Sequence, residues 1–77
     1  MKTVKISLNS IDKVKAFVND VTKFNAEFDL VSGRYVIDAK SIMGIFSLDL
    51  SKAIDLNIHD EDDIDNILSA LAPYIVE

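Results

Sequence analysis

The 77-residue chain contains no cysteine, only one proline and two glycines, and no long hydrophobic run. Without cysteine, neither disulfide bonds nor thiolate metal sites can hold the fold together, so its stability must come from packing. A membrane-spanning helix needs about 20 apolar residues in succession, and no segment approaches this length. The amino-terminal residues also lack the apolar stretch of a signal peptide. We therefore expect one domain over residues 1–77 that is cytoplasmic, has no membrane association and binds no cofactor.

Basic residues are scarce in the carboxyl-terminal part of the chain. The net charge is −5, and from Asp49 onward Lys52 is the only lysine or arginine beside eight acidic residues. Binding to the phosphate backbone of a nucleic acid depends on clustered Lys and Arg side chains. Nucleic acid is therefore not expected as a partner.

Histidine occurs once, as His59. With one histidine and no cysteine, the usual nitrogen and sulfur ligands of zinc are missing. The run of residues 59–65, which includes Glu61, offers carboxylates to calcium, but it has neither the glycine nor the third alternate ligand of an EF-hand loop. We interpret this run as the acidic start of a helix and His59 as a solvent-exposed strand residue, and we expect no metal site. No catalytic constellation can be assembled from these residues, so the chain is not expected to be an enzyme.

The spacing of apolar residues predicts the order βαββαβα. Alternation of apolar and polar residues, typical of half-buried strands, occurs in segments 3–8, 26–31, 34–38 and 54–59. Helical spacing occurs in segments 11–24, 42–48 and 64–71. Ser32-Gly33 supplies a hairpin turn between the second and third strands. Because each strand has one apolar face, we predict a two-layer α+β fold in which all helices cover one face of an antiparallel sheet.

Local signals refine the ends of these helices. Asn9 or Ser10 is expected to cap the first helix, and the buried stripe of that helix is expected to begin at Ile11. Pro73 is expected to end or kink the last helix, since proline cannot continue one. Residues 74–77 are then expected to form a tail of uncertain structure.

The segment AKSIMGIFSLDL, residues 39–50, places a serine and a glycine inside the most apolar part of the chain. Ser41 is expected to cap a short helix. Gly44 is unfavourable inside a helix by about 1 kcal/mol relative to alanine, which suggests close packing or the approach of a partner. Some apolar residues here must face the sheet, and the rest form an exposed cluster that indicates a docking surface. The predicted partner-binding residues are Ile42, Met43, Gly44, Ile45 and Phe46.

The sequence Ser41-Ile42-Met43-Gly44 is similar to the regulatory-serine motif of HPr, the histidine-containing phosphocarrier of the bacterial sugar phosphotransferase system. The resemblance extends to the chain length, the order of elements, the segment KFNAEFDL (residues 23–30), the Ser-Gly turn and the acidic start of the last helix. It implies an open-faced β-sandwich with four antiparallel strands and three helices on one face.

The resemblance also implies a role and partners. In the family, a histidine at the start of the first helix takes a phosphoryl group from Enzyme I and passes it to sugar-specific components. In many Gram-positive members, an ATP-dependent HPr kinase phosphorylates the serine that matches Ser41, and this promotes binding to a catabolite-control regulator. Enzyme I, HPr kinase and that regulator are therefore the implied partners of a protein that we expect to be a monomer.

The chain departs from the family at the start of the first helix. Ser10 occupies the position of the family histidine, and Asp12 that of the neighbouring arginine. An unactivated serine lacks the nucleophilicity of imidazole, and a carboxylate repels phosphate where a guanidinium would bind it. We therefore predict an HPr-like protein without histidine phosphocarrier activity, which acts by partner binding and by phosphorylation at Ser41. The alternative is an interaction module that uses the HPr fold for an unrelated partner.

Overall fold

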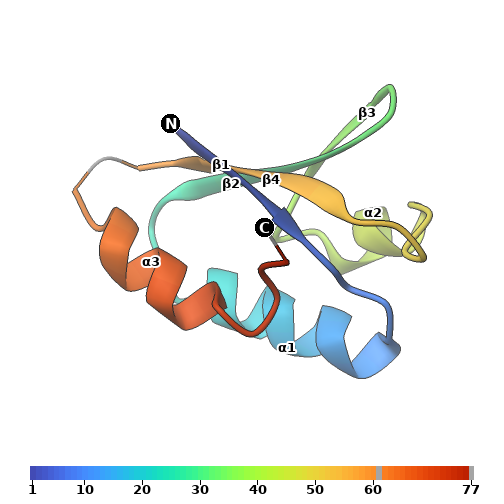
Figure 1. Ribbon diagram of the computed structural model, residues 1–77, viewed down its shortest axis with the longest axis horizontal. Helices are drawn as coiled ribbons and strands as arrows, with labels where there is room; N and C mark the ends of the chain where they lie inside the picture. The colour runs from blue at the N-terminus through green and yellow to red at the C-terminus, as the bar shows by residue number, and fades with distance from the viewer. Residues whose placement is uncertain (61, 77) are drawn as a thin grey trace.

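The computed structural model describes residues 1–60 and 62–76 and places seven elements in the predicted order (Figure 1). The strands are β1 (Lys2–Ile6), β2 (Glu27–Ser32), β3 (Tyr35–Asp38) and β4 (Ile54–His59). The helices are α1 (Ile11–Val21), α2 (Ile42–Phe46) and α3 (Ile64–Leu71). Glu61, in the predicted acidic helix start, and Glu77, in the predicted tail, lie outside the described residues.

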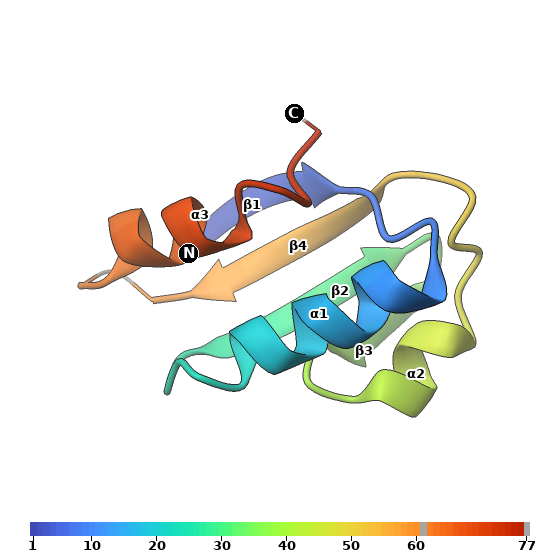
Figure 2. The same cartoon turned by 90° about the horizontal axis from the view of Figure 1, so that it is seen from below.

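The four strands form one antiparallel sheet in the order β1-β4-β2-β3. Leu56 of β4 lies between Val4 of β1 and Leu30 of β2, and Leu30 in turn pairs with Ile37 of β3. All three helices lie against the same face of this sheet, as the two views show (Figures 1 and 2). The predicted α+β fold, an open-faced sheet covered on one side, is therefore confirmed.

The core lies between the sheet and the helices, because the buried apolar residues of β1, β2 and β4 lie on that side. Phe17 of α1 and Phe28 of β2 are the largest fully buried side chains. No polar or charged residue of the described chain is buried. The opposite face carries polar cross-strand pairs, including the Thr3–Asn57 hydrogen bond of 2.7 Å and the Lys5–Asp55 ion pair of 3.0 Å. None of the described helices is long and apolar enough to cross a bilayer.

The carboxyl-terminal segment corrects the prediction of an uncertain tail. Tyr74 is buried, and its carbonyl accepts a hydrogen bond of 2.9 Å from the Ser7 N–H. Ile75 forms an isolated antiparallel bridge with Ile6, and the Val76 N–H donates to the Lys5 carbonyl at 2.9 Å. The prediction was wrong for residues 74–76 because it considered only the end of the helix. The chain turns back beyond Leu71 and pairs along β1, which is a long-range contact.

Candidate functional site

Ser10 caps helix α1. Its backbone is extended (φ −145°, ψ 156°), and its Oγ accepts a hydrogen bond of 3.1 Å from the Lys13 N–H. The Ser10 carbonyl accepts the first helical bond, from the Val14 N–H at 3.1 Å. Of the two residues expected to cap this helix, the structure therefore selects Ser10 over Asn9.

Ser41 caps helix α2 in the same way, as predicted. Its Oγ accepts a hydrogen bond of 3.3 Å from the Gly44 N–H, and its carbonyl accepts one of 3.0 Å from the Ile45 N–H. Helix α2 is shorter than predicted and ends at Phe46. Ser47 is the C-terminal cap of this helix, and its Oγ donates a hydrogen bond of 2.6 Å to the Gly44 carbonyl.

Gly44 packs closely against the edge strand β3. A Cβ added at Gly44 would lie 2.5 Å from Cγ2 of Ile37 and 3.2 Å from the Oγ of Ser41. These distances leave no room for a methyl group unless the neighbours move. Close packing inside the molecule therefore explains this glycine, and the approach of a partner is not needed to explain it.

The predicted partner-binding residues divide into buried and exposed ones. Ile45 has no exposed surface, so it is a core residue and cannot contact a partner. Ile42 and Gly44 are partly buried. Met43 is 78% exposed and Phe46 is 40% exposed. Only Met43 and Phe46 therefore present large apolar surface to the solvent.

A cleft between the start of α1 and the end of α2 enlarges this surface. Its lining residues are Asn9, Ser10, Ile11, Phe46, Leu50 and Ser51. Ile11 was predicted to begin the buried stripe of α1, but it is 61% exposed. Ile11 precedes the first buried residue of the helix, Val14, by almost one turn, so it lies beyond the edge of the core. The apolar residues Ile11, Met43, Phe46 and Leu50 are called the α1–α2 face below.

The acidic residues near this cleft, Asp12 and Asp49, are unsuited to holding a phosphate. Asp12 lies in the first turn of α1 and is exposed. The Oδ1 of Asp49 accepts hydrogen bonds from the Oγ and N–H of Ser51, at 2.6 and 3.1 Å. These bonds, together with the charge of Lys52, lower the pKa of Asp49, so it stays ionised at neutral pH. Neither histidine nor arginine lines the cleft.

His59 lies at the opposite end of the sheet from Ser10. In the β1–β4 pairing, Ile6, which leads towards Ser10, faces Ile54 at the start of β4, whereas His59 is the last residue of that strand. The His59 Nε2 is 2.6 Å from Oδ2 of Asp29 on β2. His59 therefore shares no site with the start of α1.

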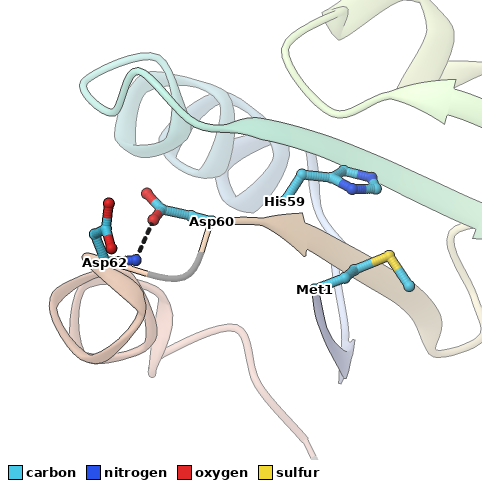
Figure 3. Close-up of a pocket in the computed structure, with 4 residues that line it drawn as sticks. All are labelled: Met1, His59, Asp60 and Asp62. Carbon is cyan, nitrogen blue, oxygen red and sulfur yellow. Dashed lines mark hydrogen bonds between the residues drawn. The ribbon is translucent and has the colours of Figure 1, made fainter.

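A shallow pocket beside His59 does not have the arrangement of a metal or phosphoryl site. Figure 3 shows the imidazole of His59 pointing away from the carboxylates of Asp60 and Asp62, which line the same pocket. The Asp60 Oδ1 accepts hydrogen bonds from the Asp62 and Asp63 N–H groups, at 2.8 and 3.2 Å. Among residues 1–60 and 62–76, no three His, Cys, Asp or Glu side chains are grouped so that they could hold a metal ion. The Asp60 side chain instead organises the backbone that leads into α3.

The fold and the serine-capped helix pair define a class of small α+β proteins with an open-faced antiparallel sheet. A family model described as the phosphorylation site of the PTS HPr component matches residues 12–77. The chain therefore belongs to the HPr family, the phosphocarrier proteins of the phosphotransferase system. The match begins two positions after Ser10, which is the residue predicted to occupy the family histidine position.

Solved structures agree with this membership. HPr-C-His from Thermoanaerobacter tengcongensis is 29% identical, with a TM-score of 0.77 over 95% of this chain and 89% of that chain. The phosphocarrier protein HPr from Bacillus anthracis is 30% identical, with a TM-score of 0.70 over 96% and 93%. A histidine-containing phosphocarrier protein of Mycoplasma is 17% identical, with a TM-score of 0.70 over 94% and 86%, and supports the fold alone. A search of curated protein sequences found no significant match.

Proposed function

We propose that this chain is a regulatory member of the HPr family that does not carry a phosphoryl group on histidine. It acts by binding protein partners and is phosphorylated on Ser41. The observation that carries this proposal is the residue at the start of α1, where the cap is Ser10 and the only histidine of the chain lies at the far end of the sheet. We further propose that residues 1–77 act as one HPr-like domain with no catalytic residue of its own.

The surroundings of Ser10 support the loss of phosphoryl relay. The Ser10 Oγ accepts the Lys13 N–H, and no base among the described residues is hydrogen-bonded to it. A phosphate ester of serine is also much less reactive in transfer than the phosphoramidate of histidine. The ionised Asp49 and the exposed Asp12 add repulsion to any phosphate brought to this cleft.

The surroundings of Ser41 support modification there. Ser41 is exposed, and its Oγ accepts one hydrogen bond of 3.3 Å, which is longer than the usual 2.9–3.0 Å for N–H···O. A phosphate on this oxygen offers further acceptor oxygens to the same N–H group. Modification therefore does not require α2 to unfold.

The α1–α2 face supports partner binding. Phe46 lines the cleft together with Ile11 and Leu50, and the exposed Met43 lies three residues before Phe46 on α2. Exposed apolar residues that gather on one face are typical of docking surfaces, and Met and Phe adapt well to different partners. Enzyme I, HPr kinase and a catabolite-control regulator are the partners that we propose for this face.

The phosphorylation test uses the full chain with two donors. The purified protein is incubated with phosphoenolpyruvate and Enzyme I, and separately with ATP and HPr kinase, and its intact mass and phosphorylated residue are measured. We expect no phosphoryl group from Enzyme I and one phosphoryl group on Ser41 from the kinase. Ser41→Ala should abolish the kinase product, and Ser69→Ala, at an exposed serine of α3, should leave it unchanged. Phosphohistidine at His59 would overturn the loss of relay, and an unmodified Ser41 would overturn the regulatory part.

The docking test compares two exposed apolar positions. Met43→Ser on the α1–α2 face should slow phosphorylation by the kinase at limiting enzyme concentration. Val76→Ser removes a similar apolar side chain, 58% exposed, from the carboxyl-terminal segment and should have no effect. Equal rates for both variants would show that the α1–α2 face is not where the kinase binds.

A further inference from the structure

The two edges of the sheet differ in how they are covered. The outer side of β1 is partly covered by the carboxyl-terminal segment, through the Ile6–Ile75 bridge. Strand β3 ends the sheet on the other side, and the turn of its hairpin with β2 points away from the helices (Figure 1). On the face covered by the helices, Ile37 of β3 packs near Gly44 of α2. An uncovered edge strand presents backbone donors and acceptors that can pair with another strand.

The hydrogen-bond pattern shows which groups of β3 face this free edge. The Ala39 N–H donates to the Phe28 carbonyl at 2.9 Å, which continues the β2–β3 register by one pair. Hydrogen-bonded and non-hydrogen-bonded pairs alternate along an antiparallel ladder. Ile37 and Tyr35 therefore bond to β2, and the backbone N–H and C=O of Val36 point outward.

The side chains at this edge are unusually apolar for an exposed strand. Tyr35 is 68% exposed and Val36 is 66% exposed. They are not part of the α1–α2 face, because they lie on the hairpin and not on either helix.

Residues 34–38, which contain β3, form a sequence whose charged and apolar side chains match a second copy of itself in the antiparallel direction. Residues 34–38 read Arg-Tyr-Val-Ile-Asp. If two copies pair about an axis at Val36, each Arg34 faces Asp38 of the second copy, and each Tyr35 faces Ile37 of the second copy. The two Val36 residues exchange their outward backbone hydrogen bonds. We propose that β3 is an interaction surface for a second copy of this chain and that it joins two sheets into one of eight strands.

The charges within one copy favour this occupant. Arg34 forms no ion pair within the described residues. Asp38 lies directly opposite Asp29 in the β2–β3 register, and like charges at opposite positions are unfavourable. One oxygen of Asp38, Oδ1, accepts the Lys40 N–H at 2.9 Å, which leaves Oδ2 for a guanidinium. Arg34 of a second copy therefore supplies the cation that Asp38 lacks.

The pairing should be weak and reversible. The Asp38 carbonyl already accepts the Ser41 N–H at 3.0 Å, so the new ladder is short. Each copy also carries a net charge of −5. Small interfaces of this kind are typical of transient association. The monomer expected from the sequence therefore predominates at low protein concentration, and the dimer forms mainly at high concentration.

The test is sedimentation velocity of the full chain over a concentration series up to roughly 1 mM. We expect reversible dimers in the parent protein. Arg34→Asp and Asp38→Arg should each weaken self-association at least about tenfold, because each places like charges opposite one another at two symmetric positions. A parent protein that stays monomeric over the whole series would overturn the proposal.

Mixing the two single variants, together with two charge controls, tests whether residues 34 and 38 face each other across the dimer. Mixed in equal amounts, Arg34→Asp and Asp38→Arg should associate, because every charge in the mixed pair meets its opposite. The double variant, whose net charge equals that of the parent, should form dimers as the parent does. Lys15→Asp, at an exposed position of α1, changes the net charge as Arg34→Asp does and should keep the dimer. Loss of dimer in Lys15→Asp, or no association in the mixture, would show that the β3 pairing is wrong.

Discussion

Helices α1 and α2 begin in the same way and are held in different ways. A serine hydroxyl caps each of them by accepting the N–H three residues later, from Lys13 in α1 and from Gly44 in α2. Helix α1 has 11 residues and buries three of them, whereas α2 has five residues and buries only Ile45. The serine cap is therefore a local device common to both helices. The packing around each cap differs, and α2 leaves Met43 and Phe46 exposed to the solvent.

The largest difference between the helices should appear when an aromatic residue is removed from each. Phe17 of α1 is fully buried and meets the Tyr74 ring edge to face at 5.5 Å, whereas Phe46 of α2 is 40% exposed. Phe17→Ala should lower the free energy of unfolding by about 3–5 kcal/mol. Phe46→Ala should lower it by about 1 kcal/mol or less but weaken partner binding. Urea unfolding of both variants measures this, and similar losses would show that α2 is packed as firmly as α1.

Glycine and alanine should have opposite effects in the two helices. Gly44→Ala should destabilise the protein by about 1–3 kcal/mol, because the new methyl group meets Ile37, and this outweighs the helix propensity gained. Ala16→Gly, at an exposed position of α1, should cost about 1 kcal/mol through propensity alone. The thermal midpoint of each variant, measured with its unfolding enthalpy, checks both values. A stabilising Gly44→Ala would mean that β3 moves away from α2 at little cost.

The contrast between the helices was only partly predictable from the sequence. Periodicity predicted the four strands and three helices, because alternation and helical spacing are local properties that burial imposes. It placed Ile11 in the core, because an apolar residue just after a cap fits the stripe even where the sheet no longer covers it. It could not show the closeness of Gly44 to Ile37 or the docking of Tyr74, since both contacts depend on how separate elements meet in space. The predictions for Ser41 and for Ser10 at the family histidine position rest on a motif, and the cleft joining Ile11 to Leu50 is visible only in the structure.

The carboxyl end of α1 is fixed by a contact that α2 lacks, and this contact should make stability depend on pH. The Tyr74 hydroxyl donates a hydrogen bond of 2.8 Å to Oδ2 of Asp20, in the last turn of α1. Burial, followed by this hydrogen bond and the charge of Asp20, raises the pKa of Tyr74 to about 12 from its ordinary value of 10. The folded state therefore favours the neutral phenol. The resulting stabilisation is complete below pH 10 and is lost as the pH rises from 10 through 12.

Urea unfolding from pH 8 to 12 measures this dependence. Tyr74→Phe keeps the ring packed on Phe17 but removes the ionisable group, so the difference between parent and variant should shrink as the pH rises. A difference that stays constant up to pH 12 would show that the Tyr74 ionisation is not coupled to folding.

The smallest effects should come from the caps themselves, and they complete the comparison of the two helices. Ser10→Ala and Ser41→Ala should each cost about 1 kcal/mol, because each leaves one helix-end N–H without its side-chain acceptor. The hydrogen bond at Ser41 is longer by 0.2 Å (3.3 against 3.1 Å), so the loss at Ser41 should be the smaller of the two. Ser→Asp at each position should recover part of the loss, since a carboxylate can accept the same N–H. Unfolding free energies of the four variants measure the order, and a larger loss at Ser41 than at Ser10 would show that α2 depends on its cap more than the hydrogen-bond length implies.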